Sequence, residues 1–332
     1  MVMLSDVRDK QLEVGASQRK RLISVVTACY NEEENVEDVY REIKKIRDKH
    51  GEYKWEHVFI DNASTDSTVD ILKSIAEYDK DVKIIVNLRN FGHVRSPYYA
   101  YVGSTGDAVV VFLCDLQEPP ELIDTFIQKW EAGHTVIVGT KTGVVENWLL
   151  SFMRKGFYRF IDLISETKQI KNFYGFGLYD KSFMTILRSL NEPYPYFRGL
   201  VAEYGTNICE VAYSQKPRKK GRSKNNLYTL YDSAALGLVS YSKLPLRLAC
   251  IIGFCSAIVC LFVALFYFSY KLLFWENFQV GTAPLVIGIF FFGAVQLFFL
   301  GVIGEYIGTL LTRVTNRPLV VERERINFDD TP

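Results

Sequence analysis

Along the first 140 residues of the chain, apolar runs typical of strands alternate with segments whose apolar residues have helical spacing. The strand-like runs, which are short, apolar and rich in β-branched side chains, are residues 22–28, 55–60, 82–86, 109–113 and 135–138. The helix-like runs, with apolar side chains three and four positions apart, are residues 32–49, 66–78 and 119–130. Repeated strand–helix–strand units predict an α/β, Rossmann-like domain with a mostly parallel sheet. In such sheets ligands bind at the carboxyl ends of the strands.

Residues 141–225 have a less regular pattern. Within them, residues 148–164 mix aromatic and apolar side chains with arginine and lysine, which is typical of an amphipathic helix in a membrane interface. An ordinary surface helix that faces the core fits this stretch equally well. Residues 226–241 form a second amphipathic pattern, which we interpret as a juxtamembrane helix.

The chain ends in two long, almost uncharged segments, residues 246–270 and 282–311. Each exceeds the roughly 20 residues that a helix needs to cross a bilayer. Their connection is short, so they are expected to form a transmembrane hairpin. Lysine and arginine flank its outer ends, whereas the connection holds one lysine. The positive-inside rule therefore predicts cytoplasmic termini and an integral membrane protein whose main domain is cytoplasmic.

The charge of the chain indicates which partners it can bind, and its cysteine content indicates the state of its thiols. The 39 Lys and Arg residues nearly balance the 38 Asp and Glu residues, which argues against a nucleic-acid partner. Basic flanks beside the apolar segments favour contact with membrane lipids. The six cysteines lack metal-ligand spacing and are expected to be reduced thiols. The expected segments are a polar tail (1–21), a cytoplasmic domain (22–225), a juxtamembrane helix (226–245), two spans (246–311) and a basic cytoplasmic tail (312–332).

Polar motifs follow several of the predicted strands. Asn31 and Glu32 could hold ribose hydroxyls or a base edge, although a helix cap with an acidic first turn explains them as well. Asp61 could accept hydrogen bonds from a nucleotide. Asp115, with Gln117 two residues later, could present hard oxygen ligands to Mg²⁺ or Mn²⁺. Such a cation would stabilise a departing diphosphate.

Taken in order, these motifs resemble family 2 glycosyltransferases, and in particular their polyisoprenyl-phosphate branch, which includes dolichol-phosphate mannose synthase and bactoprenol glucosyltransferases. The motifs stand here as Ala-Cys-Tyr-Asn-Glu at 28–32, Arg-Asn-Phe-Gly at 89–92 and Leu-Cys-Asp-Leu-Gln-Glu-Pro-Pro-Glu at 113–121. Phe-Arg-Gly at 197–199 and the basic stretch 213–224 extend the resemblance, which covers roughly residues 22–315.

The resemblance implies a GT-A-type nucleotide-sugar fold and assigns roles to individual residues. The residues implied near the nucleotide are Ala28, Tyr30, Asn31, Glu32, Asp61, Arg89 and Asn90. The implied catalytic group is Asp115, Gln117, Glu118 and Arg198, of which Asp115 and Gln117 would hold Mg²⁺ or Mn²⁺. The residues implied to contact a lipid phosphate are Lys141, Ser151, Arg154, Arg198, Arg218 and Lys224.

The implied reaction moves one sugar from a nucleotide diphosphate donor, with a UDP-hexose expected, to polyprenyl phosphate with inversion at the anomeric carbon. A phosphate monoester is an anionic nucleophile near neutral pH, so positioning and charge stabilisation should dominate. The implied location is a bacterial inner membrane. Glycines in the second apolar segment could pack helices, so a homo-oligomer is one expectation.

Several positions depart from the family pattern. Leu113 replaces the first aspartate of the D-x-D motif and cannot ligate a metal. Asn62 and Ala63 replace an aspartate and a glycine. Lys141 replaces an arginine, which keeps charge and loses bidentate geometry, and Gln215 replaces the first arginine of the basic stretch.

Two other functions are weighed against the leading one. A processive polysaccharide synthase of the same superfamily would carry a Gln-x-x-Arg-Trp string, and none of the four tryptophans sits in one. A non-catalytic scaffold that binds nucleotide or lipid would explain Leu113 and the missing arginines. An Asp115→Ala variant separates the two classes, because only a catalyst would lose sugar transfer.

Overall fold

The structure is a computed structural model of the whole chain. The residues that it describes are 20–142, 170–190, 192–193, 195–215, several separate positions between 251 and 273, 282–315 and 317–328. The chain divides into two compact units. The first comprises residues 1–148, 169–224 and 317–332, and the second comprises residues 149–168 and 225–316.

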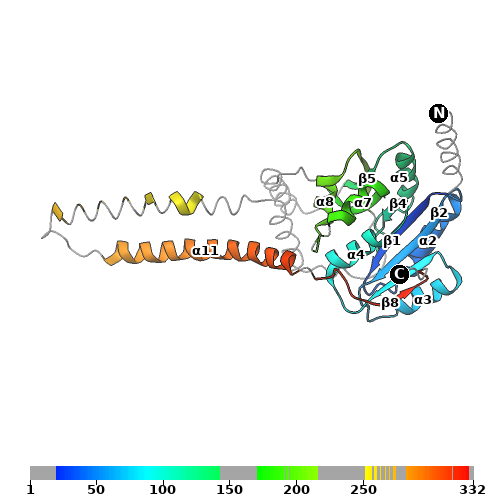
Figure 1. Ribbon diagram of the computed structural model, residues 1–332, viewed down its shortest axis with the longest axis horizontal. Helices are drawn as coiled ribbons and strands as arrows, with labels where there is room; N and C mark the ends of the chain where they lie inside the picture. The colour runs from blue at the N-terminus through cyan, green and yellow to red at the C-terminus, as the bar shows by residue number, and fades with distance from the viewer. Residues whose placement is uncertain are drawn as a thin grey trace, which may run out of the picture. The chain divides into compact units, whose positions relative to one another are not determined.

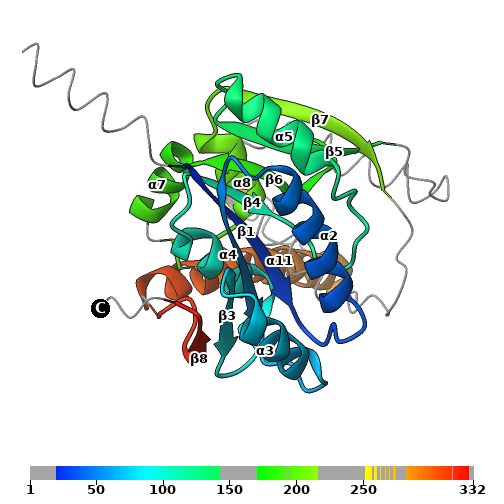
Figure 2. The same cartoon turned by 90° about the vertical axis from the view of Figure 1, so that its right-hand side faces the viewer.

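The first unit is built on an eight-stranded mixed sheet with the strand order β7-β5-β6-β4-β1-β2-β3-β8 (Figures 1 and 2). Its strands are β1 (Leu22–Cys29), β2 (Lys54–Asp61), β3 (Val82–Asn87), β4 (Ala108–Val111), β5 (Val136–Thr142), β6 (Phe173–Asp180), β7 (Ile208–Ser214) and β8 (Glu322–Ile326). Strands β3, β2, β1 and β4 are parallel, and β5 is parallel to β7. Strands β6 and β8 pair antiparallel to their neighbours. The predicted α/β class is therefore confirmed.

Helices cover both faces of this sheet. They are α2 (Val36–Lys49), α3 (Thr68–Tyr78), α4 (Gly92–Gly103), α5 (Leu122–Glu131), α7 (Lys181–Leu190) and α8 (Phe197–Tyr204). One core cluster joins α2, α3 and α5 to one face, and a second cluster joins α4, α7 and α8 to the other. Because β1 and β2 are buried on both faces, they read as continuous apolar runs, as expected for central parallel strands.

The structure corrects the prediction for the middle of the chain. Residues 141–225 have a less regular pattern, from which only the helix at 148–164 was predicted, yet their described part contains β6, α7, α8 and β7. Strand β6 inserts antiparallel between β4 and β5, so it breaks the simple parallel alternation that the sequence suggested. Helix α4 was also missed, because Pro97 lies inside it and its apolar residues lack clear helical spacing.

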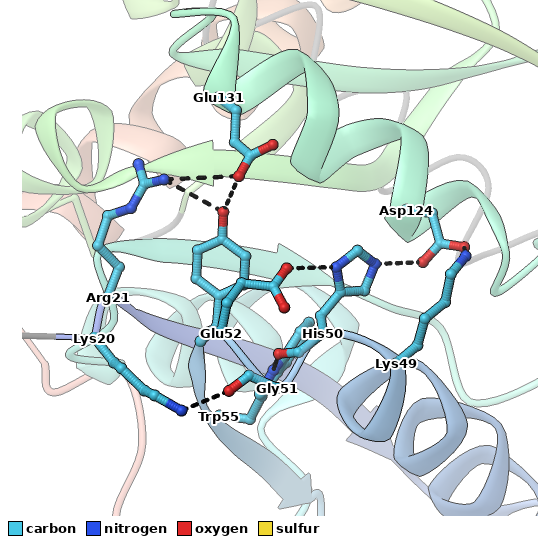
Figure 3. Close-up of polar contacts among 10 residues, drawn as sticks. Lys20, Arg21, Lys49, His50, Gly51, Glu52, Trp55, Asp124 and Glu131 are labelled. Carbon is cyan, nitrogen blue, oxygen red and sulfur yellow. Dashed lines mark hydrogen bonds and ion pairs between the residues drawn. The ribbon is translucent and has the colours of Figure 1, made fainter.

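A polar cluster lies just before β2, at the amino-terminal ends of the strands (Figure 3). His50 bridges two carboxylates, with Nε2 2.8 Å from Oδ1 of Asp124 and Nδ1 3.0 Å from Oε1 of Glu52. The Tyr53 hydroxyl donates to Glu131 on α5. Burial lowers the pKa of His50, but the two carboxylates outweigh it, so the pKa lies above its usual value. The cluster thus ties the α2–β2 connection to α5.

The described part of the second unit includes α11 (Thr282–Val314). Over the described stretches of the chain, none of the helices combines the length and the sustained apolar character of a bilayer span. The predicted amphipathic segments 148–164 and 226–245 lie outside the described residues, as does most of the predicted first span, 246–270.

Candidate active site

Three non-glycine residues with left-handed backbone mark the carboxyl ends of the parallel strands. Asn31 follows β1 with φ 51°, Ala63 follows β2 with φ 62°, and Leu116 follows β4 with φ 52°. Such residues cost of order 1–3 kcal/mol each and gather at ligand sites, where the surrounding structure holds them in place. Ala63 stands where the family pattern has glycine. Glycine adopts positive φ at no steric cost, whereas the Cβ of Ala63 makes this backbone conformation strained.

The loops after β1 and β2 interlock. The Asn31 side-chain oxygen accepts a hydrogen bond from the Thr65 amide at 2.7 Å, and the Asn31 amide donates to Ser64 Oγ at 2.8 Å. The Glu32 amide donates to Thr68 Oγ1 at 2.9 Å. Asn31 and Glu32 therefore have a structural role in the loops, whatever ligand contacts they also make.

Asp61 ends β2 beside Cys29, its register partner in β1. The residue is fully buried, and its Oδ2 accepts a hydrogen bond from the Ser64 amide at 2.9 Å. No donor among the described residues reaches its Oδ1. Burial raises the pKa of this carboxyl, and the bonds from Ser64 offset part of the shift. A buried acceptor without a partner is costly, so Asp61 is suited to an N–H or O–H group of a ligand.

Asn62 joins the end of β2 to the loop that carries Arg89. Its Oδ1 accepts from the Asn87 side chain at 3.1 Å and from the Phe91 amide at 2.9 Å. Its Nδ2 donates to Asn90 Oδ1 at 2.9 Å and to the Gly92 carbonyl at 3.3 Å. An amide at position 62 is required for this pattern, because an aspartate would lack the two donors. The family departure at Asn62 thus has a physical explanation.

The loop after β4 meets the end of β1. The sulfur atoms of Cys114 and Cys29 lie 3.6 Å apart, and both side chains are buried. Asp115 follows Cys114 directly in the chain, and Tyr30 follows Cys29. The predicted nucleotide and metal motifs are therefore brought to one edge of the sheet.

Asp115 and Gln117 were predicted to bind Mg²⁺ or Mn²⁺. The Gln117 amide donates to Asp115 Oδ1 at 3.3 Å, and Gln117 Oε1 accepts from Gln215 Nε2 at 2.7 Å. Carboxylate and amide oxygens suit either cation, and Mg²⁺ is commonly held by one or two protein oxygens with phosphates and water. Within the described residues, no group of three or more His, Cys, Asp or Glu side chains could hold a metal. The Asp115 and Gln117 oxygens fit a cation that substrate phosphates and water also coordinate.

Glu118 lies behind this loop rather than at the surface. Its side chain is 1% exposed, its Oε1 accepts from the Tyr213 hydroxyl at 3.2 Å, and Lys141 Nζ lies 3.4 Å away. Burial raises the pKa of Glu118, while the charge of Lys141 lowers it and that of Asp115 raises it. The cluster holds Lys141 at the end of β5 through its contact with Glu118.

Two predicted cationic residues gather around one aromatic ring. Lys141 Nζ lies 4.3 Å and the Arg198 guanidinium carbon 5.5 Å from the ring centre of Tyr174. Arg198 also lies 5.2 Å from the ring centre of Tyr196. Cation–π contacts hold charged groups in place without neutralising them. The arrangement suits the recognition of an anion such as a phosphate.

The remaining predicted residues divide into two groups. Ala28, half-buried at the end of β1, and Tyr30, which is 37% exposed, lie beside Asp61 along the strand ends. The predicted residues that lie outside the described part of the chain are Ser151, Arg154, Arg218 and Lys224. Sequence reasoning missed Tyr174 and Tyr213 as supports of Lys141, although Tyr213 begins the basic stretch that was singled out.

The fold and the site define an α/β enzyme that binds a charged ligand at the carboxyl ends of parallel strands. Comparison with known proteins makes this class specific. Residues 24–194 match the family model of glycosyl transferase family 2. The chain belongs to this family and is a glycosyltransferase that takes its sugar from a nucleotide sugar.

Relatives match almost the whole chain. An uncharacterized glycosyltransferase of Synechocystis is 32% identical over 90% of this chain and 93% of its own length. A prophage-derived bactoprenol glucosyl transferase of Shigella flexneri is 32% identical over 89% of this chain and 96% of its own length. Among solved structures, glucosyl-3-phosphoglycerate synthase of Mycobacterium tuberculosis matches 69% of this chain and 81% of its own at 17% identity, with a TM-score of 0.49.

Proposed function

We propose that the protein transfers a single hexose from a UDP-hexose to polyprenyl phosphate at the cytoplasmic face of a bacterial inner membrane. The observation that carries the proposal is the match to bactoprenol glucosyl transferase over 89% of this chain and 96% of the relative. A match over 89% of the chain extends well beyond the donor motifs at residues 28–121. The proposal is supported by the gathering of those motifs at one edge of the sheet.

The donor is proposed to lie across the ends of β1, β2 and β4. The buried, unpartnered oxygen of Asp61 would accept from the base or ribose, and Arg89 and Asn90 would lie beside the nucleotide. Asp115 and Gln117 would hold Mg²⁺ or Mn²⁺. A bound cation supplies positive charge that stabilises the diphosphate as it leaves.

The proposed step is a displacement at the anomeric carbon. A lipid phosphate oxygen forms a bond to that carbon, and the carbon–oxygen bond to the nucleotide diphosphate breaks, so the diphosphate leaves with the electron pair and the configuration inverts. The acceptor needs no protein base, because its second phosphate pKa is about 6. Lys141 and Arg198 would hold the acceptor phosphate, with Glu118 and Tyr213 fixing Lys141.

The membrane part of the proposal rests on sequence. The segments 246–270 and 282–311 would anchor the chain, and Ser151, Arg154, Arg218 and Lys224 would add contacts to the acceptor phosphate. Basic flanks would favour anionic lipid head groups. A bilayer anchor is the arrangement that a polyprenyl acceptor demands, because its phosphate is confined to the membrane surface.

The test is a donor screen with full-length protein in membranes. Undecaprenyl phosphate, Mg²⁺ or Mn²⁺ and a panel of radiolabelled UDP-hexoses are supplied, and labelled lipid is extracted and identified by mass spectrometry. We expect one donor to label the lipid. Asp115→Asn should reduce labelling by at least about 100-fold, whereas Asp48→Asn, which removes an exposed carboxylate on α2, should not. Failure of every donor to label the lipid would refute the proposal.

A further inference from the structure

The last described segment of the chain returns to the catalytic sheet. Strand β8 lies beside β3 (Figure 2). The two strands pair antiparallel, with Ile326 opposite Ile84 and Glu324 opposite Val86. The register shifts between Val86 and Asn87, where β3 ends and the loop of residues 88–92 begins. The C-terminal segment therefore runs beside the loop that carries Arg89 and Asn90.

The backbone of this segment contacts the loop and the helix that follows it. The Leu88 amide donates to the Val321 carbonyl at 2.9 Å. The Arg95 guanidinium, in the first turn of α4, donates to the Pro318 carbonyl. Val320, next to Val321, is 5% exposed. Backbone contacts thus extend to the residues that precede β8, so they reach the loop itself.

Side chains fasten the segment to its neighbours. Lys73 on α3 lies 2.7 Å from a Glu324 carboxylate oxygen. The Asn327 side chain donates to the carbonyls of Ala76 at 2.8 Å and Val82 at 2.9 Å. These contacts connect the segment to α3 and to the first residue of β3. They are local and polar, so changing them removes little of the hydrophobic core.

We infer that residues 317–328 form a positioning element of the donor site, which holds the loop of residues 88–92 in its binding geometry by pairing with β3. The inference rests on the proposed function, because it assigns that loop to the nucleotide. Arg323 lies at the register shift, and its positive charge acts on Asp61, where it favours the charged carboxylate.

The consequence is a coupling between strand docking and donor affinity. If only the docked form binds the nucleotide well, the apparent dissociation constant rises as the docked fraction falls. Weakening β8 should therefore weaken donor binding, even though no residue of β8 needs to touch the donor.

The test uses full-length protein and UDP with Mg²⁺ as the probe. Glu324→Lys with Asn327→Ala places like charges at Lys73 and removes two hydrogen bonds. We expect the Kd for UDP to rise about tenfold and exchange of the Leu88 amide with deuterium to accelerate. The charge-exchanged variant Lys73→Glu with Glu324→Lys, which retains Asn327, restores opposite charges, so its Kd should stay within about twofold of the wild type.

The outcomes separate this inference from the proposed function. The control Lys54→Gln changes an exposed lysine at the start of β2 and should leave the Kd unchanged. If the Leu88 amide exchanges faster in the weakened variant while UDP binds as in the wild type, the inference is wrong and the proposed function stands. An unchanged exchange rate would equally overturn the anchoring role. If the wild type itself binds no UDP, the proposed function is wrong, and the inference, which rests on it, is wrong as well.

Discussion

Replacing Asn62 by aspartate tests whether the amide at the end of β2 holds the neighbouring loop. The substitution keeps the size of the side chain and both acceptor contacts, from Asn87 and Phe91. It removes the two N–H donors that reach Asn90 Oδ1 and the Gly92 carbonyl. An aspartate oxygen would then face two acceptor oxygens at a position that is 7% exposed.

The expected cost follows from these contacts. Each lost hydrogen bond contributes about 0.5–1.5 kcal/mol, and a buried group left facing an unsuitable partner adds about 1–3 kcal/mol. Because the loop can move to separate the oxygens, part of this cost should appear as disorder of the loop. We expect Asn62→Asp to lower the free energy of unfolding by about 2–4 kcal/mol and to speed exchange at the Gly92 amide.

The measurement is urea unfolding of the full-length protein, combined with hydrogen–deuterium exchange. Asn90→Asp is the matched control for stability, since it adds the same charge to the same network and retains the oxygen that accepts from Asn62 and Gly92. Its cost should stay below about 1 kcal/mol. Equal stability of Asn62→Asp and the wild type, within about 0.5 kcal/mol, would show that the network does not hold the loop.

Three further changes test other parts of the structure. Ala63→Gly should raise the free energy of unfolding by about 0.5–1 kcal/mol in a urea titration, because glycine relieves the left-handed backbone at φ 62° and its greater freedom in the unfolded chain offsets only part of the gain; a destabilised variant would contradict this. The raised pKa of His50 stabilises the fold fully below its unfolded pKa of about 6.5, and this contribution is lost as pH rises through the higher folded pKa. The stability lost in His50→Gln should therefore be larger at about pH 5.5, below the unfolded pKa, than at about pH 8.5, roughly two units above it. A loss of stability that does not depend on pH would refute the ion pairing. Lys141→Met leaves Glu118 without its counter-charge, so labelling of the lipid should fall at least about tenfold, and labelling at the wild-type rate would exclude Lys141 from the site.

The central strands could be predicted because a strand that is buried on both faces has a continuous run of apolar residues. The strands predicted at 22–28 and 55–60 correspond to β1 and β2, whose observed bounds differ by one residue at most at each end. The donor motifs could be placed for a related reason, since the carboxyl ends of parallel strands must meet at one edge. The supports of those motifs could not be placed in this way. Tyr213 reaches Glu118 across 95 residues of sequence, and no local pattern indicates that pairing.

Strand β8 shows a different limit of sequence reasoning. Four of its five residues are charged, Glu322 to Arg325, so the segment has the pattern of a solvated basic tail rather than that of a strand. Charged side chains are, however, what an edge strand needs, because they prevent a further chain from pairing with its open side. The hydrophobic pattern predicts strands that are buried, and it therefore misses a strand that is stabilised by backbone pairing and by contacts such as Lys73 with Glu324. A charged segment near the end of the chain can thus be part of the active domain, and in this chain it lies beside the loop of residues 88–92, which we propose contacts the nucleotide.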